Sequence, residues 1–268
     1  MNHLLVESLA ARIKVCVLNQ GVWNPRKPHK NETREEIIRH GLEHKDADVY
    51  IRLTKHESLL KASAVKGQIY IEHQRLTMSS PCKGMRILPA GREFEHSSKL
   101  SNLSVEFNQH VDLFVSDYDN VIGAAKRKFK NLLDDSMFPP KEIIREKFYN
   151  RTRYMSAPTS GEWGNWILET ADICKIELQD RIVAAARKLI ETCANDGKLY
   201  SSVLDNLGEI CDMAGDFNLL EDPIIAKAVK ELKPLATEFP AEVLRESKAL
   251  RRDTGNRAQQ ILTVLNLG

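Results

Sequence analysis

Two long stripes of apolar residues constrain the fold of this chain more than any other feature. The first runs from residue 100 to 132, and its members recur every three or four positions. That spacing is typical of one face of a long amphipathic helix. The aspartates at 134 and 135 and the prolines at 139 and 140 predict its end. The stripe consists of Leu100, Leu103, Phe107, Val111, Phe114, Tyr118, Val121, Ala125, Phe129 and Leu132.

The second stripe begins at Ile167 and ends at Cys193, with steps of 4-3-4-4-3-4-4 residues. The mean step is nearer an eleven-residue repeat than a heptad, which predicts a nearly straight helix. At about 1.5 Å per residue, each of the two helices would be roughly 45 to 50 Å long. Because only about thirty residues join them, we expect the two helices to pack as an antiparallel pair.

Shorter elements are predicted on both sides of these helices. Residues 12–23 carry the β-branched residues of a strand, and a proline-containing loop, WNPRKPHKN, follows. Thr33 and Glu36 form a capping box that predicts a helix near 34–45. The chain then continues with a strand at DVYIRLT, a helix at 57–76, and helices near 199–214, 222–232 and 240–252.

The predicted fold class is therefore mainly α. It consists of a long antiparallel helix pair with shorter C-terminal helices and a small mixed α/β N-terminal portion. We divide the chain into a mixed portion at 1–88 and a helical body at 89–268, and expect the two to form one continuous elongated unit.

Composition excludes several classes of protein. With 42% hydrophobic and 28% charged residues and a net charge of +2, the chain is neither a disordered nor a membrane protein. No stretch reaches about 18 uncharged apolar residues, so we expect a cytoplasmic protein. The five cysteines include no C-x-x-C pair, which indicates reduced thiols; Cys174 and Cys193 are expected in the core.

One string, His40-Gly41-Leu42-Glu43-His44, has the H-x-x-E-H spacing of a class of zinc peptidase. In such enzymes, two histidines one helical turn apart bind the zinc ion, and a neighbouring carboxylate acts as the base that activates water. However, His40 and His44 share a face nearly opposite Ile38 and Leu42, and Gly41 weakens the helix. We interpret the string as a solvated helix end, and zinc hydrolysis at His40, Glu43 and His44 stays a remote alternative.

A second string, LFVSDYDNVI at 113–122, resembles the nucleophile strand of haloacid-dehalogenase-type phosphotransferases through its D-x-D pair. Asp117 and Asp119 equally fit the polar side of the long helix, whose apolar stripe continues through this segment. No alternation of strands and helices follows, so we favour the helix. Cys82 has no identifiable histidine partner, and neither phosphate-binding glycine pattern occurs, which disfavours nucleophilic catalysis and ATP hydrolysis.

Basic residues cluster in the segment 126–154, interleaved with Phe148, Tyr149 and Tyr154. Such a segment could follow a nucleic-acid backbone while the rings stack on bases. Alternatively, the cations favour a helix C-terminus and solvate a surface. The candidate binding residues here are Lys126, Arg127, Lys128, Lys130, Arg145, Lys147, Tyr149, Arg151 and Arg153, together with the neighbouring Lys141.

A smaller basic cluster surrounds Trp23 and contains Arg26, Lys27 and Lys30. Tryptophan and arginine are enriched at the energetic centres of interfaces, so these four residues are candidates for contact with a partner protein. The alternative is that Trp23 covers a small N-terminal core.

Several of these motifs together resemble an uncharacterised family of bacteriophage and prophage proteins. The motifs are GVWNPRK, GMRILPAG, FNQHVDLFVSDYDNVI, FPPKEIIREKF, DPIIA and LRRDTGNR, in that order along most of the chain. The resemblance implies a phage-related origin and location in the host cytoplasm. It also implies work beside a MoxR-type AAA+ ATPase and a von Willebrand factor A protein, whose genes often neighbour the family. It carries over no activity, catalytic residue or cofactor.

The sequence thus predicts a non-enzymatic binding or adaptor protein that acts through protein–protein contacts, with no catalytic residue, no cofactor and no metal ligand. A nucleic-acid-binding protein using residues 126–154 is the second hypothesis, and the zinc hydrolase is the third. Exposed apolar surface along either long helix could also support a homo-oligomer.

Overall fold

The computed structural model describes residues 3–28, 35, 39, 50–129, 133, 135–159, 163–194 and 199–264. The chain divides into two compact units, each assembled from separated stretches of sequence. Unit 1 comprises Met1–Val17, Gln74–Phe94 and Arg153–Gly268, and unit 2 comprises Leu18–His73 and Glu95–Thr152. Each unit has its own apolar core. Helices dominate the described residues, which confirms the mainly α fold class.

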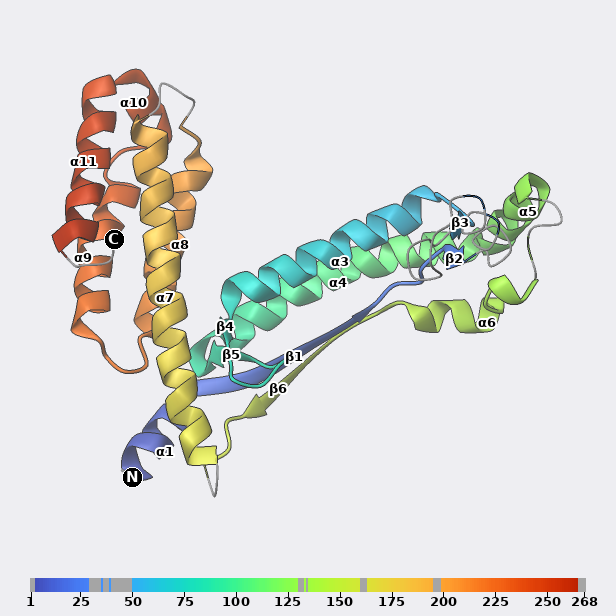
Figure 1. The fold of residues 1–268 in the computed structure, drawn as a ribbon, viewed down its shortest axis with the longest axis horizontal. Helices are drawn as coiled ribbons and strands as arrows, with labels where there is room; N and C mark the ends of the chain where they lie inside the picture. The colour runs from blue at the N-terminus through green and yellow to red at the C-terminus, as the bar shows by residue number, and fades with distance from the viewer. Residues whose placement is uncertain are drawn as a thin grey trace. The chain divides into compact units, whose positions relative to one another are not determined.

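Unit 1 is built around the long helix α7, against which α8 and α11 pack, while α9 packs on α8 and α11 (Figure 1). The second apolar stripe of the sequence lies along α7, and all eight of its members are buried, which confirms that helix. The helices of this unit are α1 (His3–Arg12), α7 (Trp163–Ala194), α8 (Ser201–Phe217), α9 (Pro223–Thr237), α10 (Ala241–Glu246) and α11 (Lys248–Val264).

Local sequence signals set several helix ends in unit 1. Asp222 caps α9, because its carboxylate accepts hydrogen bonds from the N–H groups of Ile224 and Ile225, and Pro223 occupies the first turn. The prediction of a single helix at 240–252 is wrong in one respect. The segment forms two helices, because the backbone at Ser247 is extended and separates α10 from α11.

Unit 2 contains most of the antiparallel pair α3 (Glu57–Leu76) and α4 (Glu93–Ser116), which lie side by side in Figure 1. Their direction follows from two contacts at opposite ends, His73 with His96 and His56 with Asp117. The unit also contains α5 (Tyr118–Phe129), α6 (Lys141–Ile144) and two 3-10 turns, Asp135–Met137 and Arg145–Lys147; a third 3-10 turn, Ala90–Arg92, belongs to unit 1.

The first apolar stripe is helical and mostly buried as far as Phe129, while Leu132 lies outside the described residues. Two expectations about the stripe were wrong. The helix is not continuous: α4 ends at Ser116 and α5 begins at Tyr118, with Asp117 between them. The partner of α4 in its own core is α3, whose Leu59, Val65 and Ile69 join that core, whereas α7 packs with helices of unit 1. An apolar stripe predicts that one face of a helix is buried, but it does not identify the element that packs against that face.

A four-stranded sheet has the order β4-β5-β1-β6, and β1 (Ile13–Gly21) confirms the first predicted strand. It pairs antiparallel with β5 (Arg86–Pro89) in the register Ile13↔Pro89 to Cys16↔Arg86, and β5 pairs with β4 (Met78–Ser79). The predicted strand near 50 is β3 (Tyr50–Arg52). It pairs with β2 (Arg26–Pro28), a short strand inside the segment predicted as a loop.

The edge strand β6 (Tyr149–Ser156) was not predicted, because its basic residues were interpreted as helical and loop positions. Its side chains alternate: Tyr149, Arg151, Arg153 and Met155 are exposed and the residues between them are half-buried. This two-residue period is the signal in the sequence that identifies the strand.

Among the residues placed in the structure, no helix combines the length and apolarity needed to cross a membrane.

Close packing of α7 against α11 depends on Gly255. A Cβ atom at this position would lie 2.9 Å from Cβ of Cys193. We therefore expect Gly255→Ala to lower the free energy of unfolding by about 1–3 kcal/mol through overpacking. The matched control is Gly215→Ala in α8, where a Cβ would meet no atom within 4 Å. There the smaller unfolded-state entropy should raise stability by about 0.5–1 kcal/mol. Urea denaturation of both variants measures the difference, and equal effects would contradict the packing argument.

Candidate functional site

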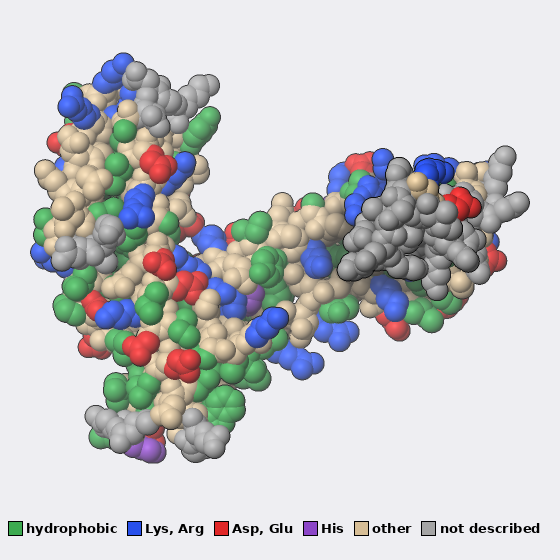
Figure 2. All heavy atoms as spheres, viewed as in Figure 1, with side chains coloured by type: hydrophobic (Ala, Val, Ile, Leu, Met, Phe, Trp, Pro, Cys, Tyr) green, Lys and Arg blue, Asp and Glu red, His purple; other side chains and the backbone are tan. Residues whose placement is uncertain are grey.

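The basic segment divides into cations that are paired locally and cations that are not. Lys126 lies 2.5 Å from Asp135, Lys141 pairs with Asp119, and Arg145 contacts Asp112 at 3.1 Å. All three pairs are exposed at the surface of unit 2. Local aspartates therefore neutralise much of the positive charge that the sequence places at 126–145. Figure 2 likewise shows acidic and basic side chains interspersed on the face that it draws.

The remaining described cations of the segment make no ion pair with a described carboxylate. They are Arg127 and Lys128 on α5, Lys147 in the 3-10 turn after α6, and Arg151 and Arg153 on β6, and all five are exposed. Lys128 lies 5.0 Å from the ring centre of Phe129. Arg151 lies over the ring of Tyr149 at 5.4 Å, an arrangement that orders the guanidinium by cation–π attraction.

Tyr149 occupies its position because Gly21 lacks a side chain. A Cβ atom on Gly21 would come within 2.3 Å of a ring carbon of Tyr149, so the tyrosine ring lies directly across the end of β1. Tyr149 is 38% exposed and Met155, on the same face of β6, is 43% exposed. Because β6 is the last strand in the sheet order, one of its edges carries no strand among the described residues. The exposed face of this edge strand therefore carries one aromatic, two cationic and one thioether side chain, in that order.

The Trp23 cluster divides between buried and surface positions. Trp23 is only 5% exposed and stacks on Phe114 at 5.8 Å, with Tyr118 edge-on at 5.9 Å. This burial favours the alternative that Trp23 covers the core of unit 2. Arg26 and Lys27 lie on β2 at the surface, while Lys30 and Lys130 are outside the described residues.

His40, Glu43 and His44 also lie outside the described residues, so the zinc-peptidase string stays a prediction. Asp117 and Asp119, the pair that resembles a phosphotransferase motif, follow a helix and not a strand. Asp117 accepts hydrogen bonds from Asn120 at 2.6 Å and contacts His56 Nε2 at 3.1 Å. The Asn120 bond, together with His56, lowers the pKa of Asp117. The carboxylate thus joins the start of α3 to the α4–α5 junction.

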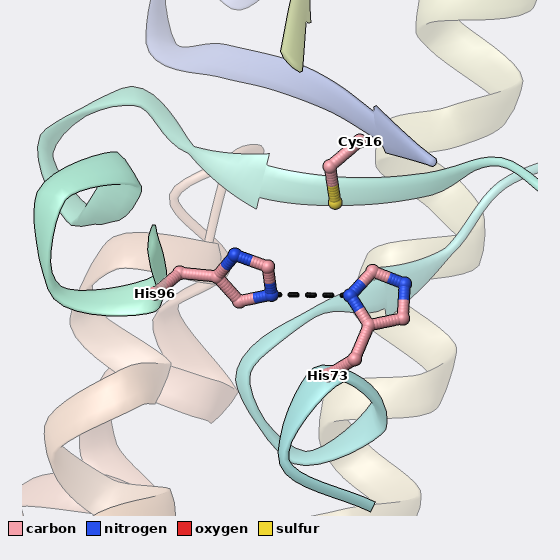
Figure 3. A group of neighbouring side chains, drawn as sticks. All are labelled: Cys16, His73 and His96. Atoms are coloured by element: carbon pink, nitrogen blue, oxygen red, sulfur yellow. Dashed lines mark hydrogen bonds between the residues drawn. The ribbon is translucent and has the colours of Figure 1, made fainter. Parts of the chain in front are cut away.

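A second histidine contact lies at the other end of the α3–α4 pair. His73 Nδ1 and His96 Nε2 are 3.1 Å apart, and both rings are buried (Figure 3). Burial lowers the pKa of His96 to about 4, against the opposing charge of Glu95, so His96 is neutral at neutral pH. Two imidazoles could provide two of the four ligands of a typical zinc site. Unit 2 brings no third described carboxylate, thiol or imidazole into the group.

Cys16, also labelled in Figure 3, belongs to unit 1. Its buried thiol donates a hydrogen bond to the Arg86 carbonyl at 3.5 Å, and burial raises its pKa to about 12. The predicted core positions of Cys174 and Cys193 are confirmed, since both are buried. Burial raises the pKa of each thiol, so neither is a reactive thiolate at neutral pH.

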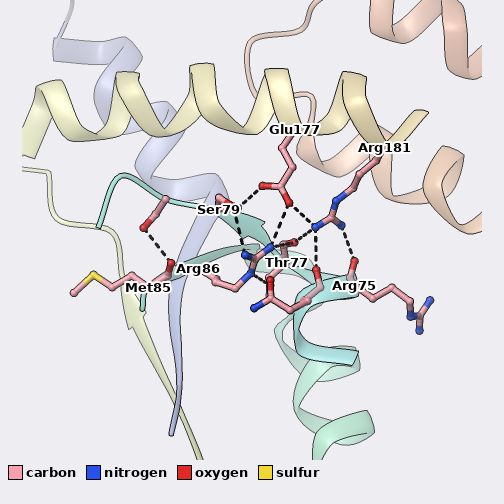
Figure 4. A network of polar contacts seen from close by, with 9 residues as sticks. Arg75, Thr77, Ser79, Met85, Arg86, Glu177 and Arg181 are labelled. Carbon is pink, nitrogen blue, oxygen red and sulfur yellow. Dashed lines mark hydrogen bonds and ion pairs between the residues drawn. The ribbon is translucent and has the colours of Figure 1, made fainter. Parts of the chain in front are cut away.

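A network of polar contacts in unit 1 surrounds Glu177 on α7 (Figure 4). Its carboxylate accepts hydrogen bonds from the Ser79 N–H at 2.6 Å and from Arg181 at 2.6 Å, and pairs with Arg86 at 3.3 Å. Arg181 also donates to the carbonyls of Gln74, Arg75 and Thr77, where α3 ends. Burial raises the pKa of Glu177, but the Ser79 and Arg181 bonds outweigh it and the net pKa is lowered.

This network joins α7, the end of α3 and the strands β4 and β5, and every carboxylate oxygen in it is used within unit 1. Its role is therefore structural. The sequence does not reveal this network, because Arg86 lies about ninety residues away from Glu177 and Arg181 along the chain.

No protein-family model, characterised protein or solved structure matches this chain in any of the three comparisons made. The resemblance to the phage family therefore stays a prediction that rests on the short motifs quoted above.

The Glu177 network makes a pH-dependent contribution to stability. We expect Glu177→Gln to lower the free energy of unfolding at pH 7 by about 2–4 kcal/mol, because the two guanidinium groups lose their anion. The folded-state pKa of Glu177 lies below its ordinary value of 4.5. The stability that the Glu177 carboxylate contributes is therefore fully present above pH 4.5, and it is lost as the pH falls through the lower, folded-state pKa. Denaturation at pH 7 and pH 3.5 should show a difference between wild type and variant that shrinks in acid.

Glu191→Gln is the matched control, since Glu191 lies on the same helix and pairs, among the described residues, with Lys188 at an exposed position. Its expected effect is below about 0.5 kcal/mol. An equal loss in the two variants would contradict the assignment of the network.

Proposed function

We propose that the protein is a non-enzymatic adaptor, and that it binds an acidic, extended segment of a partner protein along the strand β6. The single observation that carries the proposal is the exposed edge of β6 with its alternating Tyr149, Arg151, Arg153 and Met155. An added strand would form backbone hydrogen bonds with the edge, and its alternate side chains would meet this row.

The chemistry of the row indicates what the partner offers. Arg151 and Arg153 have no described carboxylate partner, and an exposed guanidinium fork matches a carboxylate in a bidentate geometry. Tyr149 and Met155 provide apolar contact at the two ends of the row. A partner strand with acidic residues opposite the arginines and apolar residues opposite Tyr149 and Met155 would satisfy both.

Two observations favour a protein over a nucleic acid as the partner. The pairing of Lys126, Lys141 and Arg145 with aspartates interrupts the positive charge that a phosphate backbone needs. Free backbone groups on a strand edge suit a peptide, which supplies matching donors and acceptors, better than a phosphate backbone, which supplies acceptors only. The phage resemblance makes an AAA+ ATPase and a von Willebrand factor A protein the first partners to test.

Charge reversal on β6 tests the proposal. Wild type and Arg151→Glu are used as bait with purified candidate partners and in extracts of infected cells, and bound protein is quantified by mass spectrometry. We expect Arg151→Glu to reduce recovery of the partner at least about tenfold. The substituted side chain carries a negative charge and repels the acidic segment that the Arg151 guanidinium attracts. Arg187→Glu on the exposed face of α7 makes the same change in charge away from β6 and should bind normally.

Hydrogen exchange identifies the mode of binding. Strand addition should slow amide exchange within residues 149–156 when the partner is bound. Equal recovery by Arg151→Glu, or unchanged exchange in β6, would refute the proposal. Retention of the wild type on duplex DNA that weakens steeply with salt, together with unprotected β6 amides, would support nucleic-acid binding in its place.

A further inference from the structure

A stripe of exposed apolar residues runs along α3, wholly within unit 2. Leu60, Ala64, Gly67 and Ile71 recur at steps of 4-3-4 residues, so they lie on one side of the helix. All four are exposed, Leu60 to 54% and Ile71 to 62%. Helices of globular proteins normally bury such a stripe, and a contiguous apolar patch left at the surface marks an interaction site.

The shape of the stripe suits a second helix. Its two ends carry large side chains, Leu60 at one end and Ile71 at the other, where Tyr70 is also 54% exposed. Its middle carries Ala64 and Gly67, and a Cβ atom added to Gly67 would meet no atom within 4 Å. Small residues at the centre let two helix axes approach closely, while the large residues at the ends pack beside them.

The stripe is complementary to itself when it is reversed. Leu60 and Ile71 are placed symmetrically about the midpoint of Ala64 and Gly67 in the chain. In an antiparallel pair of α3 helices centred on that point, Leu60 of one copy faces Ile71 of the other, and Ala64 faces Gly67. A twofold symmetric dimer requires one surface that matches itself in this way.

Charged residues beside the stripe favour the antiparallel orientation over the parallel one. Lys61 and Glu72 are eleven residues apart, or about three helical turns, and therefore lie on the same flank of α3. In the antiparallel pair, Lys61 of one copy lies within roughly 3 Å along the helix axis of Glu72 of the other, so opposite charges meet twice. A parallel pair would instead place Lys61 against Lys61 and Glu57 against Glu57, which are like charges.

The antiparallel contact does not require Lys61 or Glu72 to be unpaired in a single chain. Lys61 lies 2.7 Å from Glu57 in its own helix, and both of these side chains are more than half exposed. An ammonium group has three donors and a carboxylate accepts several hydrogen bonds, so each can hold a partner in its own chain and another in a second copy. These charges therefore determine the orientation, while the apolar stripe supplies most of the affinity.

We propose that this face of α3 is the interface of a homodimer, and that its occupant is α3 of a second copy in antiparallel orientation. The contact extends over about three turns of one helix. Such a contact is at the small end of specific interfaces, so we expect a dissociation constant of about 1–100 µM. The stripe is separate from the exposed row of β6, and the dimer does not rest on the function proposed for that row.

Sedimentation equilibrium of the full chain, from about 1 to 200 µM, tests the dimer. We expect a monomer–dimer equilibrium in the wild type. Leu60→Lys and Ile71→Lys should each weaken the dimer at least about tenfold, because each substitution places a charge in the apolar contact. Leu113→Lys makes the same change at a 58% exposed position of α4 and should dimerise like the wild type. All three positions are exposed, so the variants should fold, and thermal unfolding checks that they do.

Disulfide cross-linking tests the orientation. A mixture of the single variants Leu60→Cys and Ile71→Cys should form a disulfide-linked dimer, since the two positions face each other across the interface. Neither variant alone should do so above the wild-type background, because its two introduced cysteines would lie roughly 16 Å apart along the helix axis. Efficient cross-linking by either variant alone would overturn the antiparallel arrangement.

A wild-type chain that stays monomeric at about 200 µM would overturn the proposal. Binding of a different protein that Ile71→Lys abolishes would then assign the face to that partner. Normal dimerisation of both lysine variants would also overturn it. Arg151→Glu should dimerise like the wild type, so failure of the dimer and failure of the β6 proposal are distinguishable.

Discussion

The half-buried carboxylate of Glu177 joins several elements of unit 1. It accepts the Ser79 N–H at the start of the sheet and holds Arg86 and Arg181 on either side, and Arg181 in turn donates to the carbonyls where α3 ends. The last carbonyls of an α-helix accept no hydrogen bond within that helix, and satisfying them elsewhere in the protein avoids the cost of burying them unpaired. The end of one helix, two strands and the middle of α7 therefore depend on one anion between two cations.

Apolar burial supplies the bulk stability of each unit, but through different chemistry. The core of unit 1 is mainly aliphatic and follows the long stripe of α7 and the facing sides of α8, α9 and α11. The core of unit 2 centres on an aromatic group in which Phe114 contacts Trp23, Tyr118 and Phe148. Offset and edge-on ring contacts have preferred geometries, so this group orders the junction of α4 and α5 more specifically than aliphatic packing alone.

The proposed binding strand follows from how the basic segment 126–154 balances its cations. Lys126, Lys141 and Arg145 are each matched by a nearby aspartate. Arg151 and Arg153 make no ion pair with a described carboxylate, and they stand along a strand edge, which suits an extended peptide.

The sequence by itself determined the elements whose signals are local. The 3.6-residue period identified α4 and α7, Asp222 and Pro223 marked the start of α9, and β-branched residues identified β1, because each signal acts within one or two turns of chain. Only the tertiary structure decided the rest. Which helix covers α4, how Glu177 meets Arg86, and why Gly21 faces Tyr149 all depend on residues distant in sequence, and periodicity carries no information about such partners.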